Sequence, residues 1–359
     1  MLQGFGFAAA AAPAAATKYF FLFQCLIWEV ANGAKVGLKL RLTNYYCKTL
    51  CWPFLLRLHG CDGVCRNISL PPLRYASTRP SSASHLEEDL RNPSQLLAAY
   101  VGSLGEIKAG DRAPTYIVGS GNKGFRDGRY AMFDEITGFA QVNANFVLIA
   151  DHGNNCVRKV DRMQKLTSTA AGKCGDAGWR DGTLGQSRFD QPYNIIKSLT
   201  GNNTFFVTDH NNHAIREIDL DSETVSTFLK DEDKLYFPIA MVIDRSENKM
   251  YVTMRYSVVS IDLGTKEIVR LSNNRGDKIA LVKPREVLIT DNPRDYIRRG
   301  KRSVLTQIET TNATCREVLV WPHDNEYPSS LFLNATAPTD KTVYVSERDV
   351  VLSLRITSK

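Results

Sequence analysis

Several features that would assign this chain to a class of enzyme or membrane protein are missing from its sequence. There is no Ser/His/Asp order, no Gly-rich phosphate loop and no paired acid motif. The apolar run Tyr19–Trp28 is too short to span a membrane, so no transmembrane segment is expected. We therefore predict that the chain is not an enzyme, with no catalytic residue, no metal ligand and no cofactor.

A motif occurs twice between Gly119 and Asp219. Each copy contains an Asp-Gly pair, an aromatic residue, an apolar run ending in Asp, a polar turn and an Arg-containing run. The Asp-Gly pairs are 54 residues apart (127 to 181) and the Arg residues 58 apart (158 to 216). Periods of about 40–55 residues are typical of stacked or radial repeats. The shared positions are Asp127, Gly128, Asp151 and Arg158 in the first copy, and Asp181, Gly182, Pro192, Asp209 and Arg216 in the second.

The runs inside each copy predict short β-strands. They are rich in Val, Ile, Thr and Phe and are bounded by Gly, Asn and Asp, with no helical period between them. Asp-His-Gly-Asn-Asn and Asp-His-Asn-Asn-His separate successive runs, and Asn and Asp favour tight turns. Short strands in regular array predict an all-β chain and a propeller rather than a sandwich.

These residues resemble the NHL repeat, which implies a β-propeller with four-stranded blades. Asp181-Gly182, Phe189, Pro192 and Ile215-Arg216 match the pattern in the second copy, whereas the first copy has Ile136 in place of the Pro. The resemblance weakens after Asp219. Five units can be counted, opening at Ile136, Pro192, Pro238, Pro284 and Pro328. NHL propellers usually have six blades, so a sixth is expected in residues 86–113 or in the irregular fourth unit.

Closure of the ring by an N-terminal strand is expected, because the last unit lacks an outer strand and an open ring would leave sheet edges unpaired. The segment predicted to supply that strand is Pro114–Gly119. The domain prediction is a targeting segment at 1–34, a Cys-containing, largely irregular region at 35–110, and the propeller at 111–359. Leu86–Leu90 and Gln95–Tyr100 are expected to form a short helical turn.

The first 110 residues leave several alternatives open. Lys18 and the apolar run after it have the shape of a signal-peptide core. A mitochondrial presequence is the alternative, because residues 1–109 carry 11 Lys and Arg against 6 Asp and Glu. Cys47, Cys51, Cys61 and Cys65 fit either a zinc site or disulfides, or they remain free thiols.

Cys156 and Cys174 are predicted to form a disulfide. They are symmetric about residue 165, where a hairpin is expected to turn, and residues so related face each other across an antiparallel pair. Four N-x-S/T sequences predict glycosylation acceptors at Asn67, Asn202, Asn312 and Asn334. Together these features favour a secreted or extracellular protein over a mitochondrial or cytoplasmic one.

Two further repeated pairs have both a chemical and a structural interpretation. His152 and His210 occupy the same place in the two copies. One interpretation is a metal ring, as in the propeller lyases that these repeats resemble, but the favoured one is hairpin geometry. For Arg158 and Arg216, the favoured interpretation is an ion pair between neighbouring blades.

The predicted function is a non-catalytic binding platform on which a propeller rim recognises a protein or a glycan. One alternative is an enzyme of the lyase or hydrolase class with a metal in the central channel. Another is an intracellular scaffold for RNA or protein. Nucleic acid is not favoured as a partner, because the basic excess lies mainly outside the repeats. The sequence predicts neither the oligomeric state nor the ligand itself.

Overall fold

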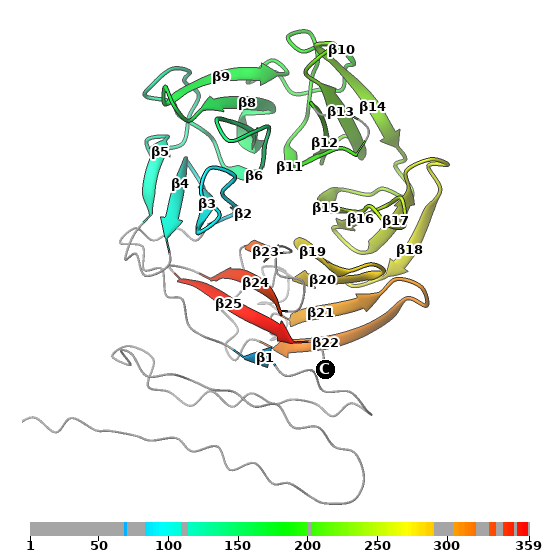
Figure 1. Cartoon of the computed structure of the whole chain (residues 1–359). Coiled ribbons are helices and arrows are strands. Elements are labelled where there is room, and N and C mark those ends of the chain that lie inside the picture. Colours follow the sequence, from blue (N-terminus) through cyan, green and yellow to red (C-terminus); the bar gives the residue numbers. More distant parts are fainter. Residues whose placement is uncertain are drawn as a thin grey trace, which may run out of the picture.

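The computed structural model describes residues 68–69, 83–108, 114–199, 201, 203–290, 304–320, 330–334, 340–347 and 350–357. These residues form six antiparallel sheets arranged around a central axis (Figure 1). The first strand of each sheet lies nearest the axis and contacts the first strand of the next sheet. The described chain is therefore a β-propeller with six blades.

The strands run outward from the axis in chain order in four of the blades, whereas the third and the last blade each take their outermost strand from an earlier segment. The first two blades contain β2 (His85–Glu88), β3 (Gln95–Tyr100), β4 (Ser103–Lys108) and β5 (Thr115–Val118), then β6 (Ile136–Gln141), β7 (Phe146–Asp151), β8 (Cys156–Asp161) and β9 (Leu166–Ala171). The third contains β11 (Pro192–Lys197), β12 (Thr204–Asp209), β13 (Ala214–Asp219) and β14 (Thr224–Lys230), with β10 (Gly182–Thr183) on its outer edge. The fourth contains β15 (Pro238–Asp244), β16 (Lys249–Met254), β17 (Val258–Asp262) and β18 (Ile268–Ser272). The last two contain β19 (Lys278–Lys283), β20 (Glu286–Thr290), β21 (Val304–Glu309) and β22 (Thr314–Val320), then β23 (Ser330–Asn334), β24 (Asp340–Glu347), β25 (Val350–Thr357) and β1 (Ile68–Ser69).

Five blades correspond to the five units counted in the sequence, and the sixth is the blade β2–β5. The helical turn expected at Leu86–Leu90 and Gln95–Tyr100 is wrong, because β2 and β3 occupy these positions. The domain boundary expected at residue 111 falls inside this blade, between β4 and β5. Pro284 does not open a blade either; it lies in the turn between β19 and β20.

The ring is closed by an N-terminal strand, as predicted, but by a different segment. β1 pairs with β25, with Ile68 opposite Ile356. The segment expected to do this, Pro114–Gly119, instead contains β5, which completes the first blade by pairing with β4. Periodicity alone could not show which N-terminal segment closes the ring, because both segments are short runs that lie outside the repeated units.

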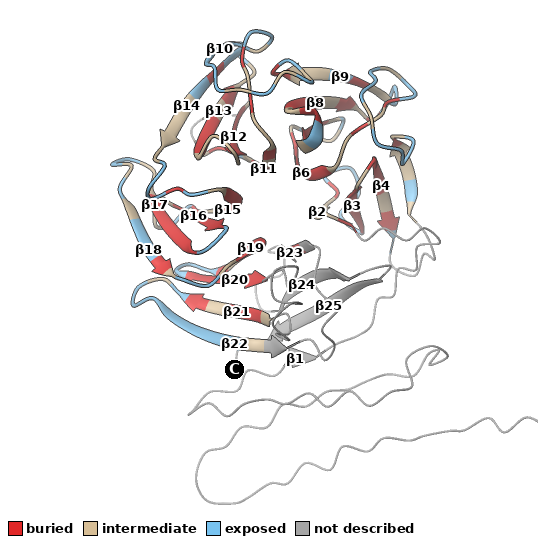
Figure 2. Cartoon of the chain, turned by 180° about the vertical axis from the view of Figure 1, so that it is seen from behind, coloured by how far each residue is buried: buried red, intermediate tan, exposed pale blue. Residues whose placement is uncertain are grey.

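The apolar core lies between blades, along their inner three strands, and the outer strands are more exposed (Figure 2). One cluster joins Leu97 and Leu104 of the first blade to Phe133, Phe139 and Ile149 of the second. The strand residues alternate between two neighbouring blades, so both faces of an inner strand are buried. Continuous apolar runs such as Phe146–Ala150 follow from this packing.

An ion pair between blades involves Arg162, which the sequence did not single out. Its guanidinium donates two hydrogen bonds to Asp89 in the first blade, at 2.8 and 2.6 Å, and one to Glu106 at 2.7 Å. Arg162 and Asp89 are both buried. The second repeat has Leu220 at the corresponding position, so the repeat pattern held no signal for this contact.

Candidate functional site

Because the strands are antiparallel, their connections alternate between the two faces of the ring. We call the face that carries the β7–β8, β12–β13 and β16–β17 turns the top face. It also carries the long connections from the outer strand of one blade to the inner strand of the next, at residues 119–135, 172–191, 231–237 and 273–277. The opposite, bottom face carries the turns between first and second and between third and fourth strands.

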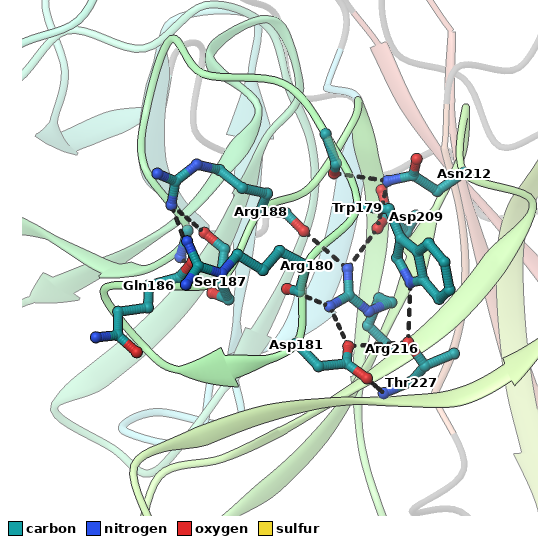
Figure 3. Close-up of polar contacts among 12 residues, drawn as sticks. Trp179, Arg180, Asp181, Gln186, Ser187, Arg188, Asp209, Asn212, Arg216 and Thr227 are labelled. Atoms are coloured by element: carbon teal, nitrogen blue, oxygen red, sulfur yellow. Dashed lines mark hydrogen bonds and ion pairs between the residues drawn. The ribbon is translucent and has the colours of Figure 1, made fainter.

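The repeated Asp and Arg residues meet in a buried network on each of two blades. Arg216 on β13 donates to Asp209 on β12 at 2.8 Å and to Asp181 at 2.6 Å (Figure 3). It also donates to the carbonyl oxygens of Arg180 and Arg188, both at 2.8 Å. The same arrangement surrounds Arg158.

These networks hold the top-face connections onto the blades. Asp181 precedes β10, which pairs with β14 of the same sheet, and its Oδ1 and Oδ2 accept hydrogen bonds from Thr227 on that strand. The prediction of an ion pair between blades is therefore wrong for these residues, because each Arg and its two Asp partners belong to one blade and its incoming connection.

The turns after Asp151 and Asp209 complete the networks. Asn154 and Asn212, each three residues later, donate to these carboxylates at 2.9 Å. Asn155 and His213 then adopt positive φ angles of 57° and 52°. Sequence matching equated Asn155 with Asn212, but the equivalent residue is Asn154.

Cys156 and Cys174 form a disulfide bond, with Sγ atoms 2.04 Å apart. Cys156 begins β8, and Cys174 lies just beyond β9 in the connection to the third blade. The pairing of β8 with β9 shifts register between Val157 and Arg158, so these two strands are not symmetric about residue 165 as predicted. The bond thus anchors a top-face connection rather than bridging two ladder positions. Of the cysteines that the structure describes, Cys315 is free and exposed.

Replacing both Cys156 and Cys174 by Ala should lower the free energy of unfolding by about 2 to 3 kcal/mol, because the bond closes a loop in the unfolded chain. Urea denaturation without reductant measures this, and Cys315→Ala is the matched control. Adding dithiothreitol should lower the free energy of unfolding of the wild type to that of the double variant. An unchanged wild-type midpoint under reduction would contradict the assignment.

A continuous series of rings crosses the top face from the rim toward the axis. Tyr256, Tyr236, His213, Phe237, His210, Tyr193 and His152 follow one another with centroid separations between 4.4 and 6.1 Å. We call these residues the ring track. Tyr256 is 60% exposed, whereas His210, Tyr193 and His152 are half-buried. The track therefore leads from an exposed side chain to the inner strand β11, near the axis of the ring.

Two histidines of the ring track, His152 and His210, are neutral near pH 7. Burial lowers the pKa of His210 to about 4 and also lowers the pKa of His152. His210 Nδ1 lies 3.0 Å from the carbonyl oxygen of Pro238, which can only accept, so Nδ1 carries the proton. No three His, Cys, Asp or Glu side chains gather as metal ligands in the part of the chain that the structure describes.

Lys278 lies at the inner end of the ring track. It begins β19 in the fifth blade, but its Nζ is 3.4 Å from the carbonyl oxygen of Thr137 on β6, in the blade across the ring. The same Nζ is 5.3 Å from the centre of the Tyr193 ring. Burial lowers the pKa of Lys278 to about 8. Lys278 could not be singled out from the sequence, because it opens a blade whose repeat pattern is irregular.

The large aromatic side chains that are exposed in the described residues are Phe125, Tyr130, Trp179, Tyr236 and Tyr256, and each lies in a top-face turn or in a connection that starts there. Tyr130 lies away from the top face, because its connection runs down the outer edge of the blade and Gly128 pairs with Thr167 near the bottom end of β9. Leu90 and Met163, which are exposed on bottom-face turns, are aliphatic. This asymmetry could not be read from the sequence, because it depends on which connections reach the same side of the ring.

The predicted glycosylation acceptors fall in different places. Asn312 is exposed in the turn between β21 and β22, and Asn334 ends β23. Asn67 and Asn202 lie outside the described residues, as do the N-terminal cysteine pairs and the basic segment Arg299–Arg302. None of the described helices has the length and apolar character needed to span a membrane.

The six-bladed ring and its repeated Asp–Arg networks define the chain as an NHL-type β-propeller. It is 33% identical over 84 residues to NHL repeat-containing protein 2 from Bos taurus, and 35% identical over 92 residues to Protein SUPPRESSOR OF QUENCHING 1, chloroplastic, from Arabidopsis thaliana. These matches cover 23% and 24% of this chain but 11% and 8% of the relatives, so it corresponds to a small part of each. No family model matches the chain.

Solved propellers share the fold at low sequence identity. A gluconolactonase from Xanthomonas campestris superposes with a TM-score of 0.56 and 9% identity, over 80% of this chain and 89% of that chain. A catalytically inactive variant of virginiamycin B lyase from Staphylococcus aureus, solved with quinupristin, superposes with a TM-score of 0.53 and 11% identity. This match covers 81% of this chain and 100% of that chain.

These two structures overturn the prediction that the chain is not an enzyme. Both are propeller enzymes that superpose on most of this chain, so the propeller fold is compatible with catalysis. The absence of a familiar catalytic order in the sequence was therefore insufficient ground for that prediction. The fold itself is shared by enzymes and binding domains.

Proposed function

We propose that this chain is an extracellular NHL-type propeller whose top face binds a partner protein. The observation that carries the proposal is the gathering of the exposed Phe125, Trp179, Tyr236 and Tyr256 on that face. Aromatic residues and Arg are enriched in protein interfaces and supply most hot spots. Arg255 adds to this set, since its guanidinium lies 5.6 Å from the rings of both Phe237 and Tyr256.

The breadth of the aromatic surface favours a folded protein over a small ligand. Phe125 lies in the connection to the second blade, Trp179 in that to the third, and Tyr256 in a turn of the fourth. A ligand touching all three must cover half of the ring. Arg158 and Arg216 hold the connections that carry Phe125 and Trp179. These two side chains therefore stand on fixed backbone, which lowers the entropic cost of binding.

An extracellular location is supported by two features of the described chain. The Cys156–Cys174 disulfide suits an oxidising compartment. Asn312, in an Asn-Ala-Thr sequence, is exposed in a turn where a glycan could be attached.

The test compares variants of the two faces in chemical cross-linking on animal cells. The top-face variant carries Trp179→Ser, Tyr236→Ser and Tyr256→Ser, and the bottom-face variant carries Leu90→Ser and Met163→Ser. Cross-linked proteins are quantified by mass spectrometry against the wild type. We expect a defined surface protein to be captured by the wild type and the bottom-face variant, and at least tenfold less by the top-face variant.

Equal capture by the two variants would contradict the proposal. A glycan as ligand would give a different result: capture would depend on Tyr236 and Tyr256 but would disappear after enzymatic deglycosylation of the cells. The melting temperatures of all three proteins are measured first, so that a loss of capture is not confused with unfolding.

A further inference from the structure

We propose that Lys278 forms a carboxylate-binding site at the inner end of the ring track. This inference deepens the proposed function, on which it rests in part, by naming the chemical group that the top face accepts near the axis of the ring. The carboxylate comes either from the partner protein, as an Asp or Glu side chain or a chain terminus, or from a free small acid.

The first argument is that the ammonium group is buried without a counterion. Lys278 is 8% exposed, and no carboxylate oxygen of the described residues makes an ion pair with its Nζ. Its hydrogen bond to the Thr137 carbonyl is long, at 3.4 Å. Buried charges are normally paired, because desolvation without compensation is costly.

The second argument is that the nearest acidic groups already have other cationic partners. Asp277 Oδ1 lies 3.3 Å from Arg275 Nε. Glu135 lies 3.6 Å from Lys123 Nζ. Their charges are thus partly neutralised, whereas Lys278 retains an unpaired positive charge between them. An incoming carboxylate would supply the missing partner.

The third argument is location. Lys278 begins its strand at the top end of β19, so its approach is from the top face, past the rings of Tyr193 and His152. Burial keeps His152 and His210 neutral near pH 7, and they add neither repulsion nor attraction by charge. Lys278 is therefore the cation that sets the charge preference at this place. Its four-carbon chain allows Nζ to move toward a ligand.

The test uses sodium acetate as probe and acetamide as its uncharged counterpart, at constant ionic strength. The full chain is labelled with ¹³C-lysine, and the Lys278 resonance is identified by its loss in Lys278→Arg. Acetate that binds the ammonium form, at ten times its dissociation constant, should raise the pKa of Lys278 by about 1. Affinity for acetate should then fall about tenfold for each pH unit above 8.

The groups that face Lys278 are Asp277, Glu135 and Tyr193, and His152 lies against the Tyr193 ring. His152, with its lowered pKa, titrates below this range, so the pH dependence above 8 reports Lys278. Lys283→Met is the matched control, because Lys283 is half-exposed and paired with Glu286. It should leave acetate binding unchanged, and Lys278→Met should abolish it.

If acetate leaves the pKa of Lys278 unchanged in the wild type, the inference is overturned, whatever the variants do. If acetate binds and Lys278→Met weakens capture of the partner at least tenfold, the partner supplies the carboxylate. If acetate binds and partner capture is unchanged, the site serves a free acid. Loss of capture in the top-face variant without any acetate effect would leave the proposed function standing and remove this site.

Discussion

Replacing Arg216 by Met is expected to lower the free energy of unfolding by about 3 to 5 kcal/mol, which is typical for breaking a buried ion pair on one side. Both Arg216 and Asp209 are fully buried. Without the guanidinium, the Asp209 carboxylate keeps its bonds from Asp190 N–H and Asn212 but loses its counterion. The carbonyl oxygens of Arg180 and Arg188 also lose their donor.

The pH dependence of this variant distinguishes lost charge from lost packing. Burial raises the pKa of Asp209 to about 6, and the charge of Arg216 is the strongest interaction opposing that rise. In Arg216→Met the pKa should rise further, so Asp209 becomes neutral at higher pH and needs no counterion. The destabilisation relative to wild type should therefore be smaller at pH 5 than at pH 7.5.

Urea denaturation at both pH values measures this effect. Arg188→Met is the matched control, because its guanidinium pairs with the half-exposed Asp176 and should cost less than about 1 kcal/mol. Arg216→Lys keeps the positive charge but loses the bidentate geometry of the guanidinium. It should lower the free energy of unfolding by an amount between those of Arg216→Met and Arg188→Met. Equal effects of Arg216→Met and Arg188→Met would show that the network does not stabilise the blade.

Replacing Lys278 by Met should stabilise the propeller by up to about 3 kcal/mol at pH 7, in contrast to the destabilising Arg216→Met. A pKa lowered from 10.5 to about 8 means that the charged form is disfavoured by that amount in the folded protein. Methionine has a similar length and no charge to desolvate. A stabilising replacement at a buried position is the result expected when the residue serves binding rather than folding.

The pH profile fixes the sign of this effect. Below pH 8 Lys278 is protonated in both folded and unfolded chains, and the folded protein bears the full penalty. Between about pH 8 and 10.5 the folded chain releases the proton first, so wild-type stability rises relative to Lys278→Met. Thermal or urea unfolding at pH 7 and pH 9.5 should show that the difference in stability between Lys278→Met and the wild type becomes smaller at the higher pH. A destabilised Lys278→Met at pH 7 would contradict the account.

The sequence predicted the parts of the fold that repeat. Asp209 and Arg216 recur with Asp151 and Arg158 because the same buried network is built on two blades, and recurrence is visible in a sequence. The propeller, its blade positions at Pro192 and Pro238, and closure by an N-terminal strand follow from that periodicity. The partners of Arg158 and Arg216 were assigned to the wrong blades, since a repeat reveals that residues correspond but not which of them meet.

Features that occur once were not predictable in this way. Arg162 binds Asp89 of the neighbouring blade, and Lys278 reaches β6 from the far side of the ring. Both contacts depend on how the blades are placed around the axis. The first blade lies mostly within residues 86–113, one of the two places where a sixth blade was expected, but its strands were not recognised. Gln95–Tyr100 is buried throughout and shows no alternation, so a short helical turn was expected there. The one-sided distribution of exposed aromatic residues likewise appears only when the connections are placed on their two faces.

The central claim is that the top face is the binding surface, and hydroxyl-radical footprinting of the chain with and without its captured partner tests it most directly. Trp179, Tyr236 and Tyr256 on the top face and Met163 on the bottom face are all exposed and all react readily. We predict that the partner protects Trp179, Tyr236 and Tyr256 at least threefold while Met163 reacts as before. Protection of Met163 with unchanged reactivity of the three aromatic residues would place the interface on the opposite face and contradict the account.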